Sequence, residues 1–384
     1  MRHFIFSLTF LLGFQFTVVS QVSDTSGVKY EFTTVVDLEH TNVKNQGSSG
    51  TCWSYSTNSF FESEMQRMGR PSIDLSEMFV VRNTYLSKAD RYVRMHGVLN
   101  FGQGGALPDV VQMFKKYGAV PQSVYSGLEY DTEINRHGEL DAVLKAMLDA
   151  VISNKNKKLT PKWKEAFTSV LDVYLGKAVS TFGYEGKQYT PMSFAKEVVG
   201  INPDDYVQLT SWTHQDFYEP MVIMVPDNWD YGISYNVPIN DMTNIVDHAL
   251  NNGYTVTWAT DVSEKYFSWK NGVAVLPANL DEKITKDDIK MILSSPHNEM
   301  LVTQEMRQKA YDNYTTSDDH GMHIVGLTKD QNGKEYYIVK NSWDTKNPHD
   351  GYIYVSKAYF KYKTISFLMN KNAIPKTIKN KLGL

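Results

Sequence analysis

The sequence predicts an α+β fold in which a mainly helical part precedes a part rich in antiparallel strands. Between residues 53 and 178, apolar residues recur at three- and four-residue steps, the spacing of amphipathic helices. Between residues 320 and 355, short apolar runs alternate with turn residues, as in strands and hairpins. The 384 residues are 42% hydrophobic and 13% aromatic, which provides for a large core. The net charge of −4 gives no basic excess for nucleic-acid binding.

The first 20 residues are expected to be a signal peptide. Arg2 and His3 precede an apolar run over residues 4–19, and small residues stand just before Gln21, as at a signal-peptidase site. The alternative is a membrane anchor, but the run is short and polar residues interrupt it. The sequence therefore predicts export to a periplasm or to the outside of the cell, without stable membrane insertion.

Residues 21–384 are expected to form one continuous domain, because the chain has no Pro/Ser-rich linker, long charge run or internal repeat. An insertion is expected at about 137–240, with two helices over 137–178 and then short strands and long ordered loops. A C-terminal tail is expected at about 370–384. The other predicted helices cover residues 53–68, 77–85, 107–117, 239–252 and 284–313, and the other predicted strands cover 29–38, 254–259, 336–340, 351–355 and a segment that starts near 320.

Cys52 is the only cysteine of the chain, which excludes an internal disulfide. It stands where a loop of small residues gives way to a predicted helix, and the start of a helix lowers the pKa of a thiol. Gly47 and Gly50 let the loop backbone pass close to a substrate, and the Gln46 amide can donate to a developing oxyanion. These features favour a nucleophile. The alternative is a small buried apolar side chain, which is what most free cysteines are.

Two distant residues complete a possible site. The strand that starts near His320 places His323 on its opposite face, and an antiparallel hairpin would bring Asn341 back beside His320. A thiol, an imidazole and an orienting amide are the groups that nucleophilic thiol catalysis requires. A metal site is the alternative use of the histidines. The set lacks a carboxylate at ligand spacing, however, and the two histidines diverge, so neither a metal nor another cofactor is expected.

The order of these residues resembles that of the papain-like cysteine peptidases. Gln46 stands six residues before Cys52, which Trp53 follows, and a distant His320 precedes the segment Asn341-Ser342-Trp343.

Further features are similar to one branch of that family, the bleomycin hydrolases and bacterial aminopeptidases C. Ser49 stands where secreted papains commonly carry a disulfide cysteine. The segment His320-Gly321-Met322 resembles the His-Ala-Met of the branch, and residues 256–262 resemble its strand before the last helices. The long insertion before His320 also suits this branch.

The resemblance implies a papain-like fold with a helical half and an antiparallel sheet half that meet at an active-site cleft. It implies Cys52 as nucleophile, His320 as general acid and base, Asn341 as the residue that orients the imidazole, and Gln46 as an oxyanion donor.

It also implies roles for residues outside this set. Trp343 would shield the contact between His320 and Asn341, with core filling as the alternative, and Gly104 and Gly105 would line the substrate cleft. The carboxylate of Leu384 would lie in the cleft and pair with the α-amino group of a substrate. The alternative for the tail is a frayed basic terminus. Members of the branch form a barrel-like hexamer, so a homo-oligomer is a hypothesis for this shorter chain.

The expected function is that of an exported cysteine peptidase that hydrolyses peptides through a thioester, as an aminopeptidase. A papain-like endopeptidase and a catalytically silent peptide-binding protein are the alternatives, and a transferase that uses the same thioester is a third.

Overall fold

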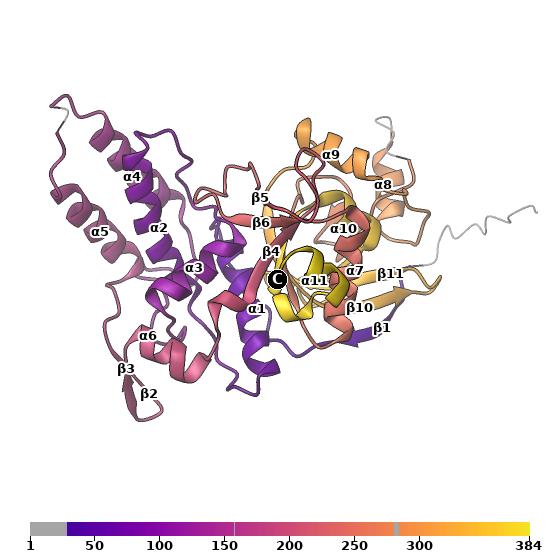
Figure 1. Ribbon diagram of the computed structural model, residues 1–384, viewed down its shortest axis with the longest axis horizontal. Helices are drawn as coiled ribbons and strands as arrows, with labels where there is room; N and C mark the ends of the chain where they lie inside the picture. Colours follow the sequence, from indigo (N-terminus) through magenta and orange to yellow (C-terminus); the bar gives the residue numbers. More distant parts are fainter. Residues whose placement is uncertain (1–28, 157, 280–283) are drawn as a thin grey trace, which may run out of the picture.

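The computed structural model describes residues 29–156, 158–279 and 284–384, in two parts that lie side by side (Figure 1). One part consists mainly of helices and the other of a large sheet with helices around it, so the predicted α+β class is confirmed. The predicted signal peptide lies outside the described residues. None of the described helices combines the length and apolar character that crossing a bilayer would require.

The helical part is built around α1, which lies between the two parts of the molecule (Figure 1). Its residues from Trp53 to Met65 are all buried, because helices α2 and α3 cover one side and strands β7 and β10 the other. The helices of this part are α1 Cys52–Arg67, α2 Glu77–Arg94, α3 Leu107–Tyr117, α4 Gly138–Ile152 and α5 Lys162–Leu175. Ser76 begins α2 as predicted, since its hydroxyl accepts a hydrogen bond from Phe79 N–H at 3.0 Å.

The sheet has eleven strands in the order β5-β6-β4-β13-β7-β10-β11-β12-β9-β8, with β1 paired to β10. Most pairs are antiparallel, and β4–β6 and β9–β12 are parallel. Strand β10 is buried along almost its whole length and pairs with β1, β7 and β11. The strands are β1 Phe32–Asp37, β4 Tyr206–Thr210, β5 Pro220–Val222, β6 Ile233–Asn236, β7 Val256–Thr260, β8 Phe267–Ser268, β9 Val273–Ala274, β10 His320–Asp330, β11 Glu335–Lys340, β12 Tyr352–Ser356 and β13 Thr364–Asn370.

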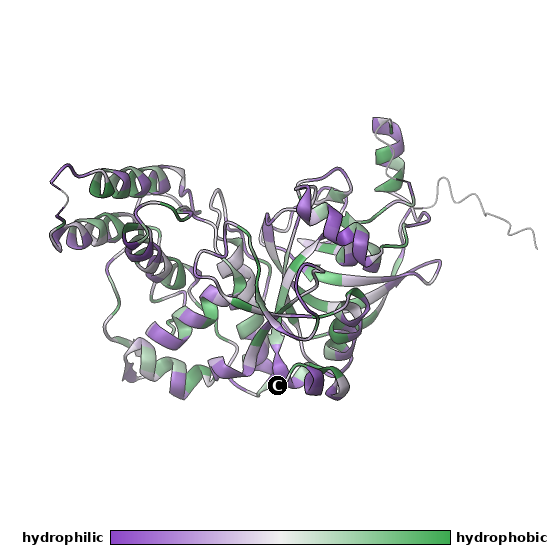
Figure 2. Ribbon diagram, turned by 45° about the horizontal axis from the view of Figure 1, so that its top comes forward, coloured by the Kyte–Doolittle hydropathy of each residue, from purple (hydrophilic) through white to green (hydrophobic). Residues whose placement is uncertain are grey.

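Two apolar cores lie on opposite faces of this sheet. One joins the helical part to Ala259, Ile365 and Leu368 on the face toward α1, and the other joins the far face to helices α7 and α10. Hydrophilic residues line the outer sides of the helices, while hydrophobic residues concentrate along the strands (Figure 2). The helices on the sheet side are α7 Ile239–Asn251, α8 Lys286–Ile292, α9 Gln304–Asp312, α10 Lys357–Lys363 and α11 Lys376–Lys381.

One expectation needs correction. The single helical stretch expected over 284–313 is two helices, α8 and α9, separated by a segment that contains Pro296, which a continuous helix does not accommodate. The insertion expected at 137–240 stays a prediction, and the elements of that range lie in two places. Helices α4 and α5 pack near α2, and the hairpin of β2 Phe182–Tyr184 and β3 Lys187–Tyr189 precedes the short helix α6 Pro191–Phe194, but β4, β5 and β6 belong to the main sheet.

Candidate active site

Cys52 is the first residue of α1, as the sequence predicted, and is a free, partly buried cysteine. Backbone N–H groups of Gly321 and Trp53 hydrogen-bond its sulfur. The loop before it is held by two contacts to Gln103, whose side-chain oxygen accepts from Gly50 N–H at 2.8 Å and whose backbone oxygen accepts from the Trp53 indole at 3.0 Å. The start of α1 is thereby fixed against the glycine-rich segment that precedes α3.

Cys52 and His320 line the same pocket, although they are 268 positions apart in the chain. The start of β10 lies against the first turn of α1, because a Cβ at Gly321 would stand 3.3 Å from the Trp53 backbone. Within the described residues the sulfur and the imidazole share the pocket without a direct hydrogen bond. Such contacts are often long in a free enzyme and shorten when substrate binds.

Asn341 lies beside His320 and contacts its ring. Its amide oxygen accepts a hydrogen bond from His320 Nε2 at 2.7 Å and a second from Ser342 N–H at 2.8 Å. The backbone donor fixes the direction of the amide, so Nε2 carries the hydrogen of the neutral ring and Nδ1 is the basic nitrogen. The Asn341 Nδ2 group is buried without a hydrogen-bond partner among the described residues.

Trp343 covers the ring of His320. The two rings stack with their centroids 4.4 Å apart and an interplanar angle of 29°. Phe267 packs edge-on against the outer side of Trp343, at 6.0 Å between centroids. The stack excludes water from one face of the imidazole, and an isolated bridge between Trp343 and Asn45 ties this segment to the loop before Cys52.

Gln46 is buried beside the same segment, but it is not among the residues that line the pocket. Its side-chain oxygen accepts from the Ser342 hydroxyl at 2.6 Å, and its Nε2 donates to the Ser49 carbonyl at 2.7 Å. One of the two Nε2 hydrogens is therefore committed to the loop and the other is free to donate. Its role as an oxyanion donor stays a prediction.

The expectation of a lowered thiol pKa needs correction. Burial, with smaller contributions from the charges of Asp318 and Asp227, raises the pKa of Cys52 to about 12 against the lowering effect of the Gly321 N–H. Burial also lowers the pKa of His320 to about 4 against the opposing hydrogen bond to Asn341. A buried site disfavours either charge alone. Transfer of the thiol proton to His320 creates both charges together, and their mutual attraction offsets the lost hydration.

The two glycines predicted to line the cleft have different surroundings. Gly105 lines the pocket with Cys52. Gly104 lies beside the Asp227 carboxylate, which a Cβ at this position would approach to 2.1 Å. Lys88 of α2 holds the segment, because its buried ammonium donates to the carbonyls of Gly102, at 2.9 Å, and of Gly104.

The sequence analysis did not identify three residues of the site region. Asp227 and Asp318 line the pocket, and Lys88 clamps the glycine segment. Asp318 could have been suspected, since it stands two positions before His320. Asp227 and Lys88 lie in other elements, and no local pattern points to either.

The tail does not lie in the pocket, so the expected place of Leu384 is wrong, and the frayed alternative is wrong too. Asn370 at the end of β13 donates to Glu64 on α1 at 2.9 Å, twelve residues and about 18 Å along that helix from Cys52. The chain then forms α11, and Ile378 and Leu382 anchor it in the core on the far face of the sheet, where Leu384 also packs. Apolar burial therefore decides the place of the tail.

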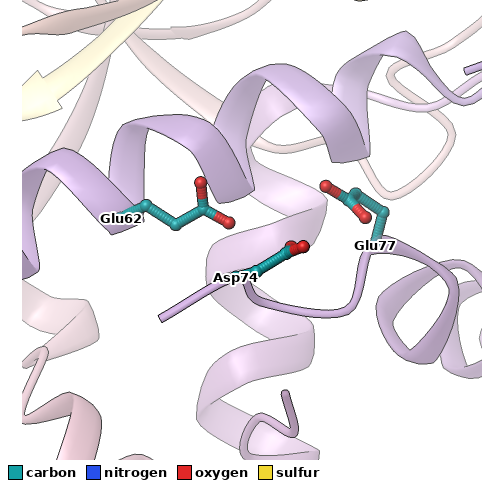
Figure 3. A group of neighbouring side chains, drawn as sticks. All are labelled: Glu62, Asp74 and Glu77. Atoms are coloured by element: carbon teal, nitrogen blue, oxygen red, sulfur yellow. The ribbon is translucent and has the colours of Figure 1, made fainter. Parts of the chain in front are cut away.

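Three carboxylates point toward one another from α1, from the loop after it and from the start of α2: Glu62, Asp74 and Glu77 (Figure 3). The ammonium of Lys44 forms ion pairs with all three, at 3.3 Å to Glu62 and 2.5 Å to Glu77. This ammonium lies among the three carboxylates where a metal ion would be bound, so the group is an ion-pair network between the first loop and helices α1 and α2, with Glu62 and Glu77 buried and Asp74 exposed.

Residues 15–383 match the family model described as Peptidase C1-like family. The chain is similar to aminopeptidase C of Streptococcus thermophilus, with 23% identity over 395 residues that cover 90% of this chain and 84% of that protein. It is also similar to aminopeptidase W of Lactobacillus delbrueckii subsp. lactis, with 24% identity over 89% of this chain and 84% of that protein. The mitochondrial cysteine proteinase 1 of Saccharomyces cerevisiae (strain ATCC 204508 / S288c) is 22% identical over 91% of this chain and 79% of that protein.

Among solved structures, the fold is similar to that of PepW from Lactobacillus rhamnosis HN001 (DR20), with a TM-score of 0.71 and 19% identity. The likeness covers 91% of this chain and 84% of that one, so the two chains share a fold over most of their lengths.

Proposed function

The chain belongs to the Peptidase C1-like family and is a papain-like cysteine peptidase, and on that premise we propose that Cys52, His320 and Asn341 are its catalytic residues. The observation that carries the proposal is that Cys52 and His320 line one pocket while Asn341 bonds His320 at 2.7 Å. The recognition of the family and the predicted fold are confirmed.

The proposed reaction begins with transfer of the thiol proton from Cys52 to Nδ1 of His320. The thiolate attacks the carbonyl carbon of the scissile amide and forms a tetrahedral oxyanion, which the N–H of Cys52 and the free Nε2 hydrogen of Gln46 would stabilise. His320 then gives its proton to the departing amine, and a thioester remains. Water adds to the thioester with His320 as base, releases the acid and restores the thiol.

The finer proposal is that the enzyme is an aminopeptidase. Three of the curated relatives it resembles are named aminopeptidases C, G and W.

We also propose that the enzyme is exported, on the basis of the N-terminal segment alone. Expression of the full chain in a bacterium, followed by N-terminal sequencing of the protein recovered outside the cytoplasm, tests it. The expected mature protein begins near Gln21. A chain that keeps its first residues and stays in the cytoplasm would contradict the proposal.

The catalytic assignment is tested by Cys52→Ala and by the control Ser63→Ala on the same helix. Hydrolysis of aminoacyl fluorogenic amides is measured for both. We expect Cys52→Ala to lose at least about 10³-fold in kcat, because no other group can form the thioester, and Ser63→Ala to keep its activity. Turnover that survives in Cys52→Ala would overturn the assignment, and a wild type that binds peptides without turnover would indicate the silent peptide-binding alternative.

A further inference from the structure

The pocket beside Cys52 has an acidic wall that the catalytic residues do not explain. Asp227, from the loop between β5 and β6, and Asp318, two positions before His320, line it together with Cys52 and His320. Asp319 also lines the pocket, and Asp109 is near it at the start of α3. These four carboxylates are not equivalent, because only some of them have partners.

Asp109 and Asp319 are engaged by neighbouring groups. Asp109 accepts from the Trp229 indole at 2.7 Å and from Ala106 N–H at 3.0 Å. Asp319 accepts from Ser263 N–H at 3.0 Å and from the Ser317 hydroxyl at 2.8 Å. Both carboxylates therefore serve to hold the loops around the pocket.

Asp227 and Asp318 retain capacity for a ligand. Asp227 accepts one hydrogen bond, from Asn100 at 3.2 Å, and Asp318 accepts none and forms no ion pair among the described residues. Burial raises the pKa of Asp227 and the charge of Lys88 opposes that rise, but this ammonium donates its hydrogen bonds to the carbonyls of Gly102 and Gly104. Burial, together with the neighbouring charge of Asp227, raises the pKa of Asp318 to about 8, so this carboxyl gives up its proton at neutral pH only when a cation binds beside it. Asp318 therefore lacks a positive partner among the described residues, while Asp227 has only the charge of Lys88 near it.

We propose that Asp227 and Asp318 bind the α-ammonium group of the substrate and thereby set cleavage after the first residue. The proposal rests on the aminopeptidase function proposed above. The sequence analysis expected the carboxylate of Leu384 to supply the negative charge that pairs with this ammonium. Leu384 lies elsewhere, and the proposal assigns that charge to the two aspartates.

The place of the two acids favours the α-ammonium as the source. Asp227 and Asp318 line the same pocket as Cys52 and His320, so an ammonium bound there belongs to a residue close to the scissile carbonyl. The absence of a side chain at Gly104 lets the Asp227 carboxylate approach the cleft backbone. An α-ammonium held at this wall would place the carbonyl of the same residue next to Cys52.

Ammonium binding would also act on the nucleophile. The carboxylates of Asp227 and Asp318 are two of the groups that disfavour the Cys52 thiolate. A bound ammonium neutralises them, so a substrate with a free amine makes proton transfer to His320 easier than a blocked substrate does. The two aspartates are specificity-determining residues whose loss affects both KM and kcat for free-amine substrates.

The test uses Asp318→Asn, Asp227→Asn and the control Asp230→Asn, whose carboxylate lies on the same loop as Asp227 and is paired with Arg91. Three substrates are compared: an alanyl coumarin amide, its N-acetyl form, and an N-blocked dipeptide amide with lysine at the penultimate position. We expect each pocket variant to lose about 10- to 100-fold in kcat/KM for the free amine, the usual size of a charge-assisted contact. Activity on the acetylated form should stay within about threefold, and Asp230→Asn should match the wild type.

Each other result has a distinct meaning. A wild type that hydrolyses none of the substrates contradicts the proposed function itself. Pocket variants that keep the full preference for the free amine overturn the inference. An equal loss of activity on the free and acetylated substrates also overturns it when the thermal unfolding and the Cys52 alkylation of the variant stay normal. A selective loss of activity on the blocked lysine substrate would show that the two aspartates bind a side-chain ammonium, and it would reject binding of the α-ammonium.

Discussion

At the scale of single residues, the direction of one amide controls the proposed chemistry. Asn341 presents its oxygen to His320 because Ser342 N–H donates to the same oxygen. This contact leaves Nδ1 as the basic nitrogen of the neutral ring.

Asn341→Ala is therefore expected to lower kcat about 10- to 100-fold with little change in KM, since the imidazole loses its orientation and not its chemistry. Steady-state kinetics on an alanyl amide measure both constants. Asn332→Ala, in the turn between β10 and β11, is the control. An unchanged kcat in Asn341→Ala would show that the ring needs no orienting group.

A second residue, His137, gives a pH-dependent prediction. It is fully buried, both ring nitrogens have no hydrogen-bond partner among the described residues, and burial lowers its pKa to about 4. The unfolded chain binds a proton at this residue near pH 6.5 and the folded chain only near 4, so the stability contributed by neutral His137 is present above pH 6.5 and is lost as the pH falls toward 4.

We subtract the unfolding free energy of the wild type from that of His137→Phe at each pH. This difference should be about 2 kcal/mol larger, in favour of the variant, at pH 5 than at pH 8. Chemical denaturation at the two pH values measures this difference. His96→Phe, at an exposed position, should show no such difference. Equal effects of His137→Phe at both pH values would mean that His137 is not buried in the neutral form.

At the scale of elements, the loop before α1 positions the nucleophile and depends on one glycine. Gly47 has φ +62°, and a Cβ there would lie 2.4 Å from the Asn135 backbone oxygen. Gly69, after the same helix, has φ +68° with open space around it. Alanine substitutions at Gly69 and Gly47 therefore separate two free-energy costs. Gly69 reports the cost of the positive φ alone, and Gly47 reports that cost together with the clash against Asn135.

Gly69→Ala is expected to destabilise the protein by about 1 kcal/mol and to leave activity unchanged. Gly47→Ala should cost about 1–3 kcal/mol more and should reduce kcat/KM, because the loop with Gln46 must shift. Thermal unfolding and steady-state kinetics on both variants decide the matter. Full activity in Gly47→Ala would mean that the loop geometry does not matter to catalysis.

The elements also show which features were predictable from the sequence. Helices α1, α2 and α3 and strands β10, β11 and β12 were predicted because their periodicity and end signals are local. Strands β4 and β13 were not, since each is defined by pairing with a distant strand. The residues of the proposed catalytic set were identified from residue types in a family order, and their roles stay a proposal. Asp227 and Lys88 could not be identified in this way, because only the folded chain brings their elements to the pocket.

At the scale of the whole molecule, the site lies where two bodies meet along α1. Cys52 belongs to the helical part and His320 to the sheet, so their approach depends on how the sheet packs against that helix. The C-terminal segment packs on the far face of the same sheet and contributes to stability there. The hypothesis of a homo-oligomer remains a proposal for solution measurements.

Deletion of residues 382–384 should lower the thermal unfolding temperature, because Leu382 is buried, and should leave the preference for free-amine substrates unchanged. Leu382→Ala, which keeps the terminal carboxylate, is the matched control and should lose a similar part of the stability. A shift toward blocked or internal sites in the deletion, but not in Leu382→Ala, would return the terminal carboxylate to the cleft and contradict the present placement.

The rate of alkylation of Cys52 by iodoacetamide at pH 7 tests most directly whether His320 activates the thiol. Because Cys52 is the only cysteine, the reaction reports on this sulfur alone. The account predicts that His320→Ala reacts at least tenfold more slowly than the wild type, because burial raises the pKa of the thiol and no imidazole takes its proton. His323→Gln, on the opposite face of β10, should react like the wild type. Equal rates for the wild type and His320→Ala would contradict the account.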